Sequence, residues 1–160
     1  MELREIVATD IPWIEATVSK YFGGPTVVSR GKLYFIRDLP GFLACEGSGP
    51  VGLIQYNLGG RECEIVVLIS TIQHMGIGRA LIDRAIQIAT DHACQRLWLI
   101  TTNDNEAALK FYRSLGWKQV AIHEGAMRES RRLKPEIPEF NRAGTPIEDE
   151  LEFELMLEDR

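Results

Sequence analysis

The residues Gln73-His74-Met75-Gly76-Ile77-Gly78 form a short turn whose two glycines let the backbone come close to an anionic ligand. The turn follows a β-branched run, residues 65 to 72, and precedes an amphipathic run, residues 79 to 93, so it is expected to join a strand to a helix. The first N–H groups of a helix lack intrahelical partners, and the aligned peptide dipoles make that end partly positive. A phosphate or pyrophosphate is therefore an expected ligand, although a tight turn without a ligand explains the glycines equally well.

The elements that must position this turn follow from apolar periodicity and from turn residues. Strands are expected at residues 2–8, 42–46, 51–57, 62–70, 96–101, 117–123 and 150–157, and helices at residues 11–22, 79–93 and 106–115. Asn103-Asp104-Asn105 caps the last of these helices, and Gly116 ends it. Residues 26–38 are interpreted as a loop-rich stretch, because β-branched residues there are mixed with turn signals, and residues 125–144 are polar and rich in Arg and Pro.

The order of these elements predicts a mixed sheet. The runs at 42–46, 51–57 and 62–70 are separated by short turn-forming segments, which is typical of an antiparallel meander. A strand, the Gly-x-Gly helix, a second strand and a capped helix then form a right-handed crossover, which makes two neighbouring strands parallel. Such a pair can open a cleft in which a ligand seated on the helix start pairs with free backbone groups.

Composition limits the function classes. The 160 residues, of which 45% are hydrophobic, are consistent with one domain spanning 1–160. Eighteen basic and 23 acidic residues give a net charge of −5, which argues against a nucleic-acid partner. No signal peptide or membrane-spanning run is evident, so we expect a cytoplasmic protein with no membrane partner. Cys45, Cys63 and Cys94 have no metal-ligand spacing and are expected to be reduced thiols.

Two motifs resemble those of the GNAT superfamily of acyl-CoA-dependent N-acyltransferases. The cofactor motif of that superfamily, Gln/Arg-x-x-Gly-x-Gly/Ala, is matched by Gln73, Gly76 and Gly78. Its following motif, roughly Asn-x-x-Ala-x-x-Phe-Tyr-x-x-x-Gly-Phe, is matched by Asn105, Ala108, Phe111, Tyr112, Gly116 and Trp117. The resemblance is specific from residue 62 to 117. It implies an α/β (α+β) fold with a GNAT-like mixed, mostly antiparallel central sheet, a parallel strand pair at a central cleft, and flanking helices on both faces.

The resemblance also implies acetyl-CoA as the cosubstrate and no metal. Backbone amides of Met75, Gly76, Ile77, Gly78 and Arg79, at the turn that Gln73 begins, would hold the CoA pyrophosphate. The backbone of Leu68, Ile69 and Ser70 would pair with the pantetheine arm, which Asn105 would help to seat. His74-Met75 stands where relatives commonly carry a basic or small pair. His74 is therefore either a phosphate contact or a solvated turn residue.

Tyr112 matches the position where many relatives place a phenol near the CoA sulfur. The departing thiolate can take a proton from a group of pKa about 10, close to the ~8.5 of a thiol. Tyr112 is therefore the expected general acid. The alternative is that Phe111 and Tyr112 only pack their helix against the sheet.

A carboxylate is expected to act as the general base, because an amine of pKa near 10 is mostly protonated at pH 7. Glu62 and Glu64 alternate with Cys63 on one strand, so they share a face. In related folds a carboxylate of this strand often acts through water, which makes Glu64 the first candidate and Glu62 the second. Solvated acids at the start of a strand are the alternative interpretation.

The acceptor cannot be read from the sequence. Residues 128–134 carry four bases and one acid, and residues 146–160 carry seven acids and one base. These segments face each other or water, or one of them lines the acceptor pocket. The acidic segment would favour a cationic amine, and the basic one a carboxylate or phosphate. Arg30 is a further candidate contact. Edge pairing of residues 150–157 would give a homodimer, although their acids argue against it.

These observations predict a single-domain, acetyl-CoA-dependent N-acetyltransferase. It would act on a primary amine of a small molecule or peptide, by direct transfer in a ternary complex, with no metal and no covalent enzyme intermediate. The alternative is a non-catalytic acyl-CoA sensor on the same fold. A P-loop nucleotide hydrolase is disfavoured, because the turn lacks a Gly-Lys-Ser/Thr ending.

Overall fold

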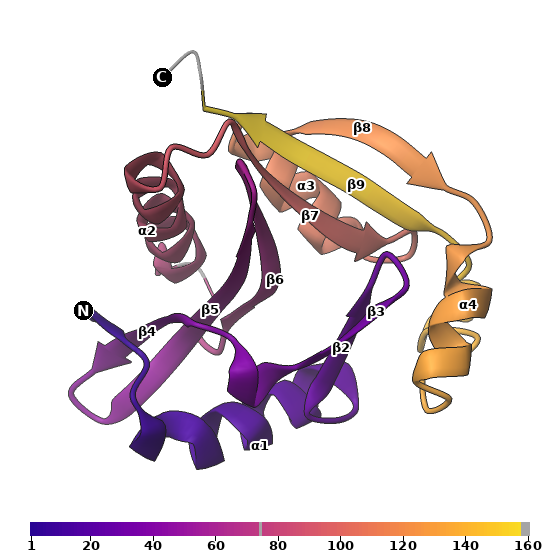
Figure 1. Cartoon of the computed structure of the whole chain (residues 1–160). Helices are drawn as coiled ribbons and strands as arrows, with labels where there is room; N and C mark the ends of the chain where they lie inside the picture. Colours follow the sequence, from indigo (N-terminus) through magenta and orange to yellow (C-terminus); the bar gives the residue numbers. More distant parts are fainter. Residues whose placement is uncertain (74, 158–160) are drawn as a thin grey trace.

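The computed structural model describes residues 1–73 and 75–157. Seven strands form one sheet in the order β1-β4-β5-β6-β7-β9-β8, and β2 and β3 form a separate hairpin (Figure 1). The strands are β1 (Glu2–Glu5), β2 (Thr26–Ser29), β3 (Lys32–Phe35), β4 (Gly41–Glu46), β5 (Gly49–Gly59), β6 (Glu62–Ser70), β7 (Arg96–Thr102), β8 (Lys118–His123) and β9 (Glu150–Met156). The helices are α1 (Ile11–Phe22), α2 (Ile77–Asp91), α3 (Glu106–Ser114) and α4 (Ala126–Leu133), with 3₁₀ turns at Ala8–Asp10 and Ile36–Asp38.

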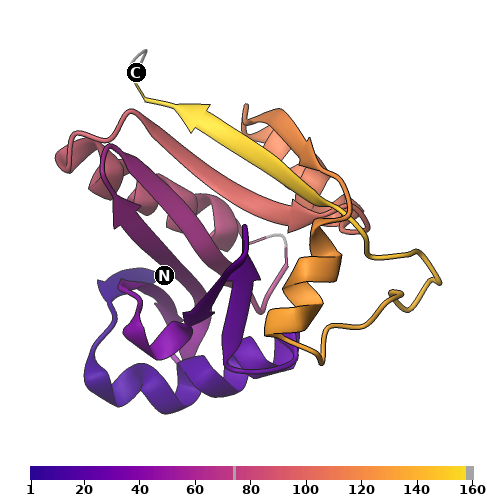
Figure 2. The same cartoon turned by 45° about the vertical axis from the view of Figure 1, so that its right-hand side comes forward.

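The predicted parallel pair is confirmed, and it is short. β6 pairs with β7 in parallel only from Glu62↔Arg96 to Glu64↔Trp98, whereas β6 continues to Ser70 beside its antiparallel partner β5. In Figures 1 and 2 the two strands lie close together at their first residues and separate toward their last residues. Within residues 1–73 and 75–157, the edge of β6 that would face β7 therefore has no strand partner beyond Glu64.

A β-bulge marks the place where the strands separate. Gln55 of β5 is opposite Val67 and Tyr56 is opposite Ile65, so Val66 is the extra residue. A bulge changes which face the following side chains occupy. Val66, Val67 and Ile69 consequently all belong to one hydrophobic cluster.

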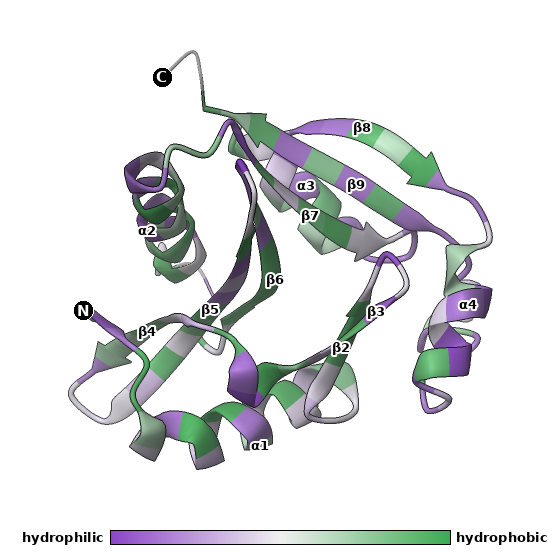
Figure 3. Cartoon of the chain, in the orientation of Figure 1, coloured by the Kyte–Doolittle hydropathy of each residue, from purple (hydrophilic) through white to green (hydrophobic). Residues whose placement is uncertain are grey.

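Each face of the sheet has its own hydrophobic cluster. Buried residues of α2 and α3 pack with Cys63 and Ile65 of β6 on one face. Buried residues of α1 and of the β2–β3 hairpin pack with the bulge residues on the other face. Helices flank both faces, as predicted. Figure 3 shows β6 as mainly hydrophobic, whereas β9 alternates between hydrophobic and hydrophilic residues.

The largest difference from the sequence interpretation lies in residues 26–38. The loop-rich interpretation is wrong, because these residues form the β2–β3 hairpin with four antiparallel pairs from Thr26↔Phe35 to Ser29↔Lys32. The Arg30-Gly31 turn signal is its two-residue turn, with φ of 47° and 76°. Positive φ at both positions matches the twist of the flanking strands. The strands have only four residues each, too few for a clear periodicity.

Two other segments differ in extent or content. The first strand ends at Glu5 instead of residue 8, because residues 8–10 form a 3₁₀ turn in which the Asp10 carboxylate accepts hydrogen bonds from the Val7 N–H and the Arg4 guanidinium. Within the polar stretch 125–144, residues 126–133 form α4, which contacts β2 (Figure 2).

The cysteines are free thiols, with Cys63 and Cys94 buried and Cys45 half-buried. In the described parts of the chain, no helix is both long and apolar enough to cross a membrane.

Candidate active site

The glycine turn has the predicted form at the start of α2. Gly76 is the N-cap residue with φ of 70°, a left-handed conformation in which a Cβ is strained. The next amides, of Ile77, Gly78 and Arg79, belong to the first turn of the helix and have no intrahelical acceptor. Gly76, Met75 and Arg79 are exposed. The turn therefore presents free amides and a positive helix end to solvent, whereas His74 lies outside the described residues.

Glycines at and beside the turn leave space for the close packing of α2 against α3 and against the sheet. A Cβ on Gly78 would stand 3.1 Å from Cζ of Phe111, so the small residue lets α3 pack against the start of α2. A Cβ on Gly52 of β5 would stand 2.5 Å from the Ile77 side chain, so the first turn of α2 rests directly on the sheet. Gln73 donates a 3.2 Å hydrogen bond to the Ser70 carbonyl, which closes the turn.

Leu68, Ile69 and Ser70, the expected pantetheine contacts, lie on the part of β6 that β7 leaves unpaired. The Ile69 side chain is buried toward α1, and Leu68 packs toward α2, so their backbone is what remains for a ligand. Asn105 caps α3 by accepting a 3.2 Å hydrogen bond from the Ala108 N–H. Asn105 also lines the pocket between β6 and β7, where it can contact a ligand with its amide nitrogen.

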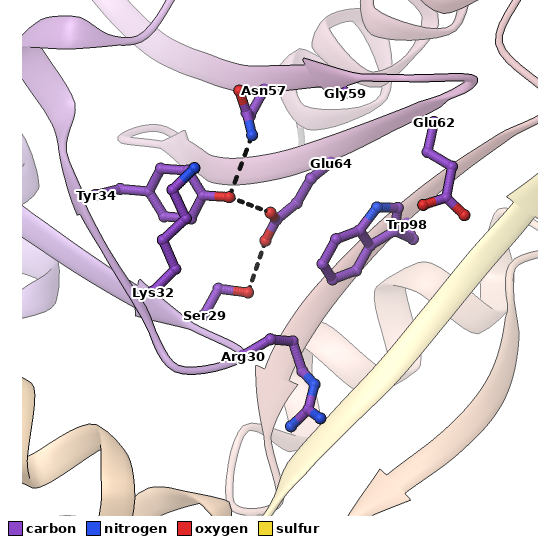
Figure 4. A pocket seen from close by; sticks show the side chains of 9 residues that line it. All are labelled: Ser29, Arg30, Lys32, Tyr34, Asn57, Gly59, Glu62, Glu64 and Trp98. Atoms are coloured by element: carbon purple, nitrogen blue, oxygen red, sulfur yellow. Dashed lines mark hydrogen bonds between the residues drawn. The ribbon is translucent and has the colours of Figure 1, made fainter.

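Glu64 lies at the end of the paired part of β6 and is 3% exposed. Its Oε2 accepts a 2.6 Å hydrogen bond from the Ser29 hydroxyl, and its Oε1 accepts a 2.6 Å hydrogen bond from the Tyr34 hydroxyl (Figure 4). Both donors come from the β2–β3 hairpin. Burial raises the pKa of Glu64, and the two hydrogen bonds oppose that rise in part. Glu64 is therefore a buried carboxyl group whose proton affinity is increased, as a general base requires.

Two pockets meet at Glu64. The first, of about 470 Å³, lies between the separated strands and is lined by Glu64, Ile65 and Val66 of β6, by residues 100–102 of β7, and by the ends of α1, β2 and α4. The second, of about 280 Å³, lies at the other side of Glu64 and is lined by Ser29, Lys32, Tyr34, Asn57 and Trp98, among others (Figure 4). We call them the cleft pocket and the hairpin pocket. Ser29 and Glu64 line both.

Glu62 shares a face with Glu64, as the alternation predicted, since both line the hairpin pocket. Its environment is different. A carboxylate oxygen of Glu62 lies 2.9 Å from the Arg96 guanidinium, and the side chain is 49% exposed. Glu62 does not line the cleft pocket, so of the two candidate bases only Glu64 lines both cavities.

Tyr112 lies in the core on the α3 side of the sheet and is 7% exposed. Its ring centroid lies 5.3 Å from that of Phe111, 5.6 Å from that of Trp117 and 6.2 Å from that of Phe153. Burial is the cause of its raised pKa, with no contribution from a hydrogen bond or a charge. The phenol is thus neutral and protonated, and its ring packs against three other aromatic rings.

The basic segment 128–134 and the acidic segment 146–160 both reach the cleft pocket. Glu150 of β9 is 1% exposed and lies 3.2 Å from the Arg30 guanidinium, and it lines the cleft pocket. Lys134, at the end of α4, is 4% exposed and lines the same pocket. Each segment therefore contributes a buried charged residue to this cavity. Arg30 itself lines the hairpin pocket.

Sequence reasoning missed Ser29 and Tyr34 as site residues, and it named Lys134 and Glu150 only as members of two charged segments, one of which could line the acceptor pocket. Ser29 and Tyr34 act through the hairpin, which was interpreted as a loop. Lys134 and Glu150 lie outside both motifs, and the charge of their segments does not indicate which of their residues enters the pocket. Their roles follow from packing that brings α4 and β9 to β2.

The comparisons with known proteins agree with this geometry. The family model described as "Acetyltransferase (GNAT) family" matches residues 11–117. The uncharacterised protein YdhI of Bacillus subtilis is 39% identical over 141 residues, which cover 88% of this chain and 88% of that protein. The chain belongs to the GNAT acetyltransferase family.

Solved structures of this family share the fold. The crystal structure of a Bacillus subtilis acetyltransferase in complex with CoA has a TM-score of 0.67 at 18% identity, covering 98% of this chain and 97% of that one. A GNAT family acetyltransferase from Elizabethkingia anophelis with acetyl-CoA bound has a TM-score of 0.70 at 17% identity, covering 98% of this chain and 97% of that one. By family, the protein is an acetyl-CoA-dependent acyltransferase.

Proposed function

We propose that the protein transfers the acetyl group of acetyl-CoA directly to a primary amine held in the cleft pocket. The observation that carries this proposal is the position of Glu64, a buried carboxyl group at the point where β6 and β7 separate. The thioester would enter from the glycine turn, with its pyrophosphate on the first amides of α2 and its pantetheine arm along Leu68, Ile69 and Ser70. The amine would come from the opposite side of the pocket.

Glu64 is the proposed general base. The amine binds as an ammonium ion, Glu64 takes one proton directly or through water, and the free nitrogen lone pair attacks the thioester carbonyl carbon. The raised pKa of Glu64 supports this role, because a carboxylate of ordinary pKa is a weak base toward an ammonium ion. The hairpin pocket on the other side of Glu64 offers water a place to collect that proton.

Tyr112 is the proposed general acid. When the tetrahedral intermediate collapses, the C–S bond breaks and the CoA thiolate takes the phenol proton. The nitrogen of the intermediate loses its remaining extra proton to water and the phenolate regains one from water, which leaves a neutral amide and CoA as products. Burial raises the pKa of the phenol, so it keeps its proton until the thiolate forms, and among the described residues no acceptor is hydrogen-bonded to it. No covalent enzyme intermediate and no metal take part.

The first test is calorimetric titration with acetyl-CoA, beside NAD and ATP, followed by a thiol-release assay with pooled amines. We expect acetyl-CoA alone to bind, with thiol release that depends on an amine. At a hundredfold excess over Kd the ligand should stabilise the fold by about 2.7 kcal/mol, which a thermal melt would register. Binding without release from any amine would favour a sensor.

The same assay separates the two candidate bases. Glu64→Gln keeps the size and the hydrogen-bonding geometry of the side chain, and should lower kcat by about 10²-fold or more with little change in acetyl-CoA affinity. Glu62→Gln is the matched control and should retain most activity. The opposite ranking would assign the base to Glu62.

A further inference from the structure

The cleft pocket also carries information about the acceptor, and this inference rests on the proposed function. Apart from its cofactor side, the walls are mainly apolar and come from several elements. They include Tyr21, Val27, Val28, Met127, Ile137 and Pro138. The volume of about 470 Å³ is within the usual range for small-molecule sites. An acceptor that shares this pocket with the thioester must have an apolar body of small-molecule size.

The charged groups of the cleft pocket are mainly acidic. Four carboxylates line it, those of Glu64, Asp104, Glu136 and Glu150, together with the single ammonium of Lys134. Glu64 is hydrogen-bonded by neutral hydroxyls only, and the nearby Lys32 ammonium lies 4.6 Å from the centroid of the Tyr34 ring, on the side of the hairpin pocket. A cationic amine is the natural counter-ion for such a carboxylate.

The Lys134 ammonium does not provide an anion site. Its Nζ donates a 2.7 Å hydrogen bond to the Phe22 carbonyl and a 2.6 Å hydrogen bond to the Thr26 carbonyl, so it ties α4 to the end of α1 and the start of β2. Burial lowers its pKa, and the nearby Glu136 opposes that change. An anionic acceptor would meet the Glu136 carboxylate at the same place.

Asp104 and Glu150 also have partners already. Asp104 accepts hydrogen bonds from the Thr102 hydroxyl and the Asn141 amide, and Glu150 pairs with Arg30. Tyr21 and Phe22 also line the pocket and are 48% and 38% exposed, so the pocket includes solvent-accessible aromatic residues. Aromatic faces attract cations and apolar groups, and they offer nothing to a carboxylate.

We infer that the acceptor is a small primary amine with an apolar or aromatic body and no carboxylate or phosphate group. The carboxylate of Glu64 receives the ammonium group, the apolar walls receive the body, and the acidic lining excludes anionic analogues. An amino acid and an acidic peptide are therefore poor acceptors.

Matched pairs of amines test this inference. The probes are 2-phenylethylamine against phenylalanine, hexylamine against 6-aminohexanoic acid, and an amidated tetra-alanine peptide, each at saturating acetyl-CoA. We expect kcat/KM to be at least tenfold higher for the amine without the carboxylate in each pair, and higher for 2-phenylethylamine than for the peptide. Three outcomes would overturn the inference. They are a kcat/KM for phenylalanine or 6-aminohexanoic acid equal to or above that of the matched amine, a higher kcat/KM for the peptide than for 2-phenylethylamine, and no turnover of any probe by a protein that binds acetyl-CoA.

A charge-reversal variant makes the same test within the protein. Glu136→Lys should lower the preference for 2-phenylethylamine over phenylalanine at least fivefold, with acetyl-CoA affinity unchanged. Glu139→Lys is the control with the same charge change at an exposed residue that does not line the cleft pocket, and it should leave the preference as it was. Equal effects of the two variants would contradict the inference. Failure of acetyl-CoA to bind would instead reject the proposed function.

Discussion

Tyr34 and Glu64 are joined by a 2.6 Å hydrogen bond in which the phenol donates to Oε1 of the carboxylate. The hydrogen bond stabilises the charged form of Glu64 and so lowers its pKa, against the larger effect of burial, which raises it. The phenol therefore regulates how strongly the proposed base binds its proton.

Tyr34→Phe should make the acid limb of the kcat/KM profile move to higher pH. Loss of the donor raises the pKa of Glu64 further, so a smaller fraction is deprotonated at a given pH. We expect the limb to shift by about one pH unit, since one hydrogen bond to a charged group contributes about 1.5 kcal/mol. Tyr56→Phe removes the hydroxyl of another buried tyrosine, on the α2 side of the sheet, and should leave the limb in place. If the acid limb of the Tyr34→Phe variant is unchanged, the group that titrates in that limb is not Glu64.

Gly76→Val should abolish measurable acetyl-CoA binding. The N-cap φ of 70° costs a β-branched residue more than the ~1–2 kcal/mol of an ordinary side chain, so the first turn of α2 must change. We expect Kd, measured by calorimetry, to rise at least 10²-fold. Gly60→Val is the matched control, because Gly60 has φ of 61° and open space around its Cβ position. It lies at the opposite end of β6, about 27 Å of strand away.

Gly78→Val tests the same turn through packing. Its Cβ would stand 3.1 Å from the Phe111 ring, so α3 must shift away from α2. Acetyl-CoA affinity should fall roughly tenfold or more, and a thermal melt should register a lower Tm. Gly78→Ala with Phe111→Leu provides space and should restore part of the affinity. If Gly76→Val and Gly78→Val both leave the acetyl-CoA affinity unchanged, the turn does not bind the CoA pyrophosphate.

The turn and the strands around it could be predicted because their signals are local. The β6 bounds of Glu62–Ser70 and the start of α2 follow from a β-branched run, two glycines and a helical period within 30 residues. The parallel pair then follows from the handedness of the crossover. These features depend on neighbours in sequence, and the structure confirms them.

The surroundings of Glu64 could not be predicted in the same way. Ser29 and Tyr34 reach it from a hairpin whose strands have four residues each. Lys134 and Glu150 reach the cleft pocket from α4 and β9, more than 65 residues beyond Glu64 in the chain. Their positions depend on tertiary packing, and a single sequence carries no pattern for it.

Tyr112→Phe should lower kcat about 10²-fold while acetyl-CoA affinity stays nearly constant. The ring remains in its contacts with Trp117 and Phe153, so the fold is preserved and only the proton donor is lost. Rapid-quench or steady-state kinetics with calorimetry would separate the two quantities. Tyr56→Phe again controls for removal of a buried hydroxyl. If the Tyr112 and Tyr56 variants have equal rates, Tyr112 serves only as a core residue.

Arg96→Met should destabilise the fold through the three carboxylates that surround Arg96. The guanidinium lies 2.9 Å from Glu62, 2.8 Å from Glu152 and 2.5 Å from Glu154, and the side chains of Arg96, Glu152 and Glu154 are at most 20% exposed. Removing the cation leaves like charges together in a partly buried place, so we expect a loss of about 2–4 kcal/mol in urea unfolding at pH 7. Arg37→Met breaks an exposed pair with Glu15 and should cost less than about 1 kcal/mol.

The pH dependence of that loss tests its electrostatic origin. Burial raises the pKa of Glu152, but hydrogen bonds from Arg96 and His123 lower it more, so the folded-state pKa lies below the usual value. A carboxyl group of this kind contributes stability above its unfolded-state pKa and loses that contribution as the pH falls through its folded-state pKa. The difference in unfolding free energy between the parent and Arg96→Met should therefore be largest near pH 7 and should shrink as the pH falls below about 4. An equal difference at both pH values would assign the loss to packing of the Arg96 side chain over Trp98, whose ring centroid lies 5.5 Å from the guanidinium carbon.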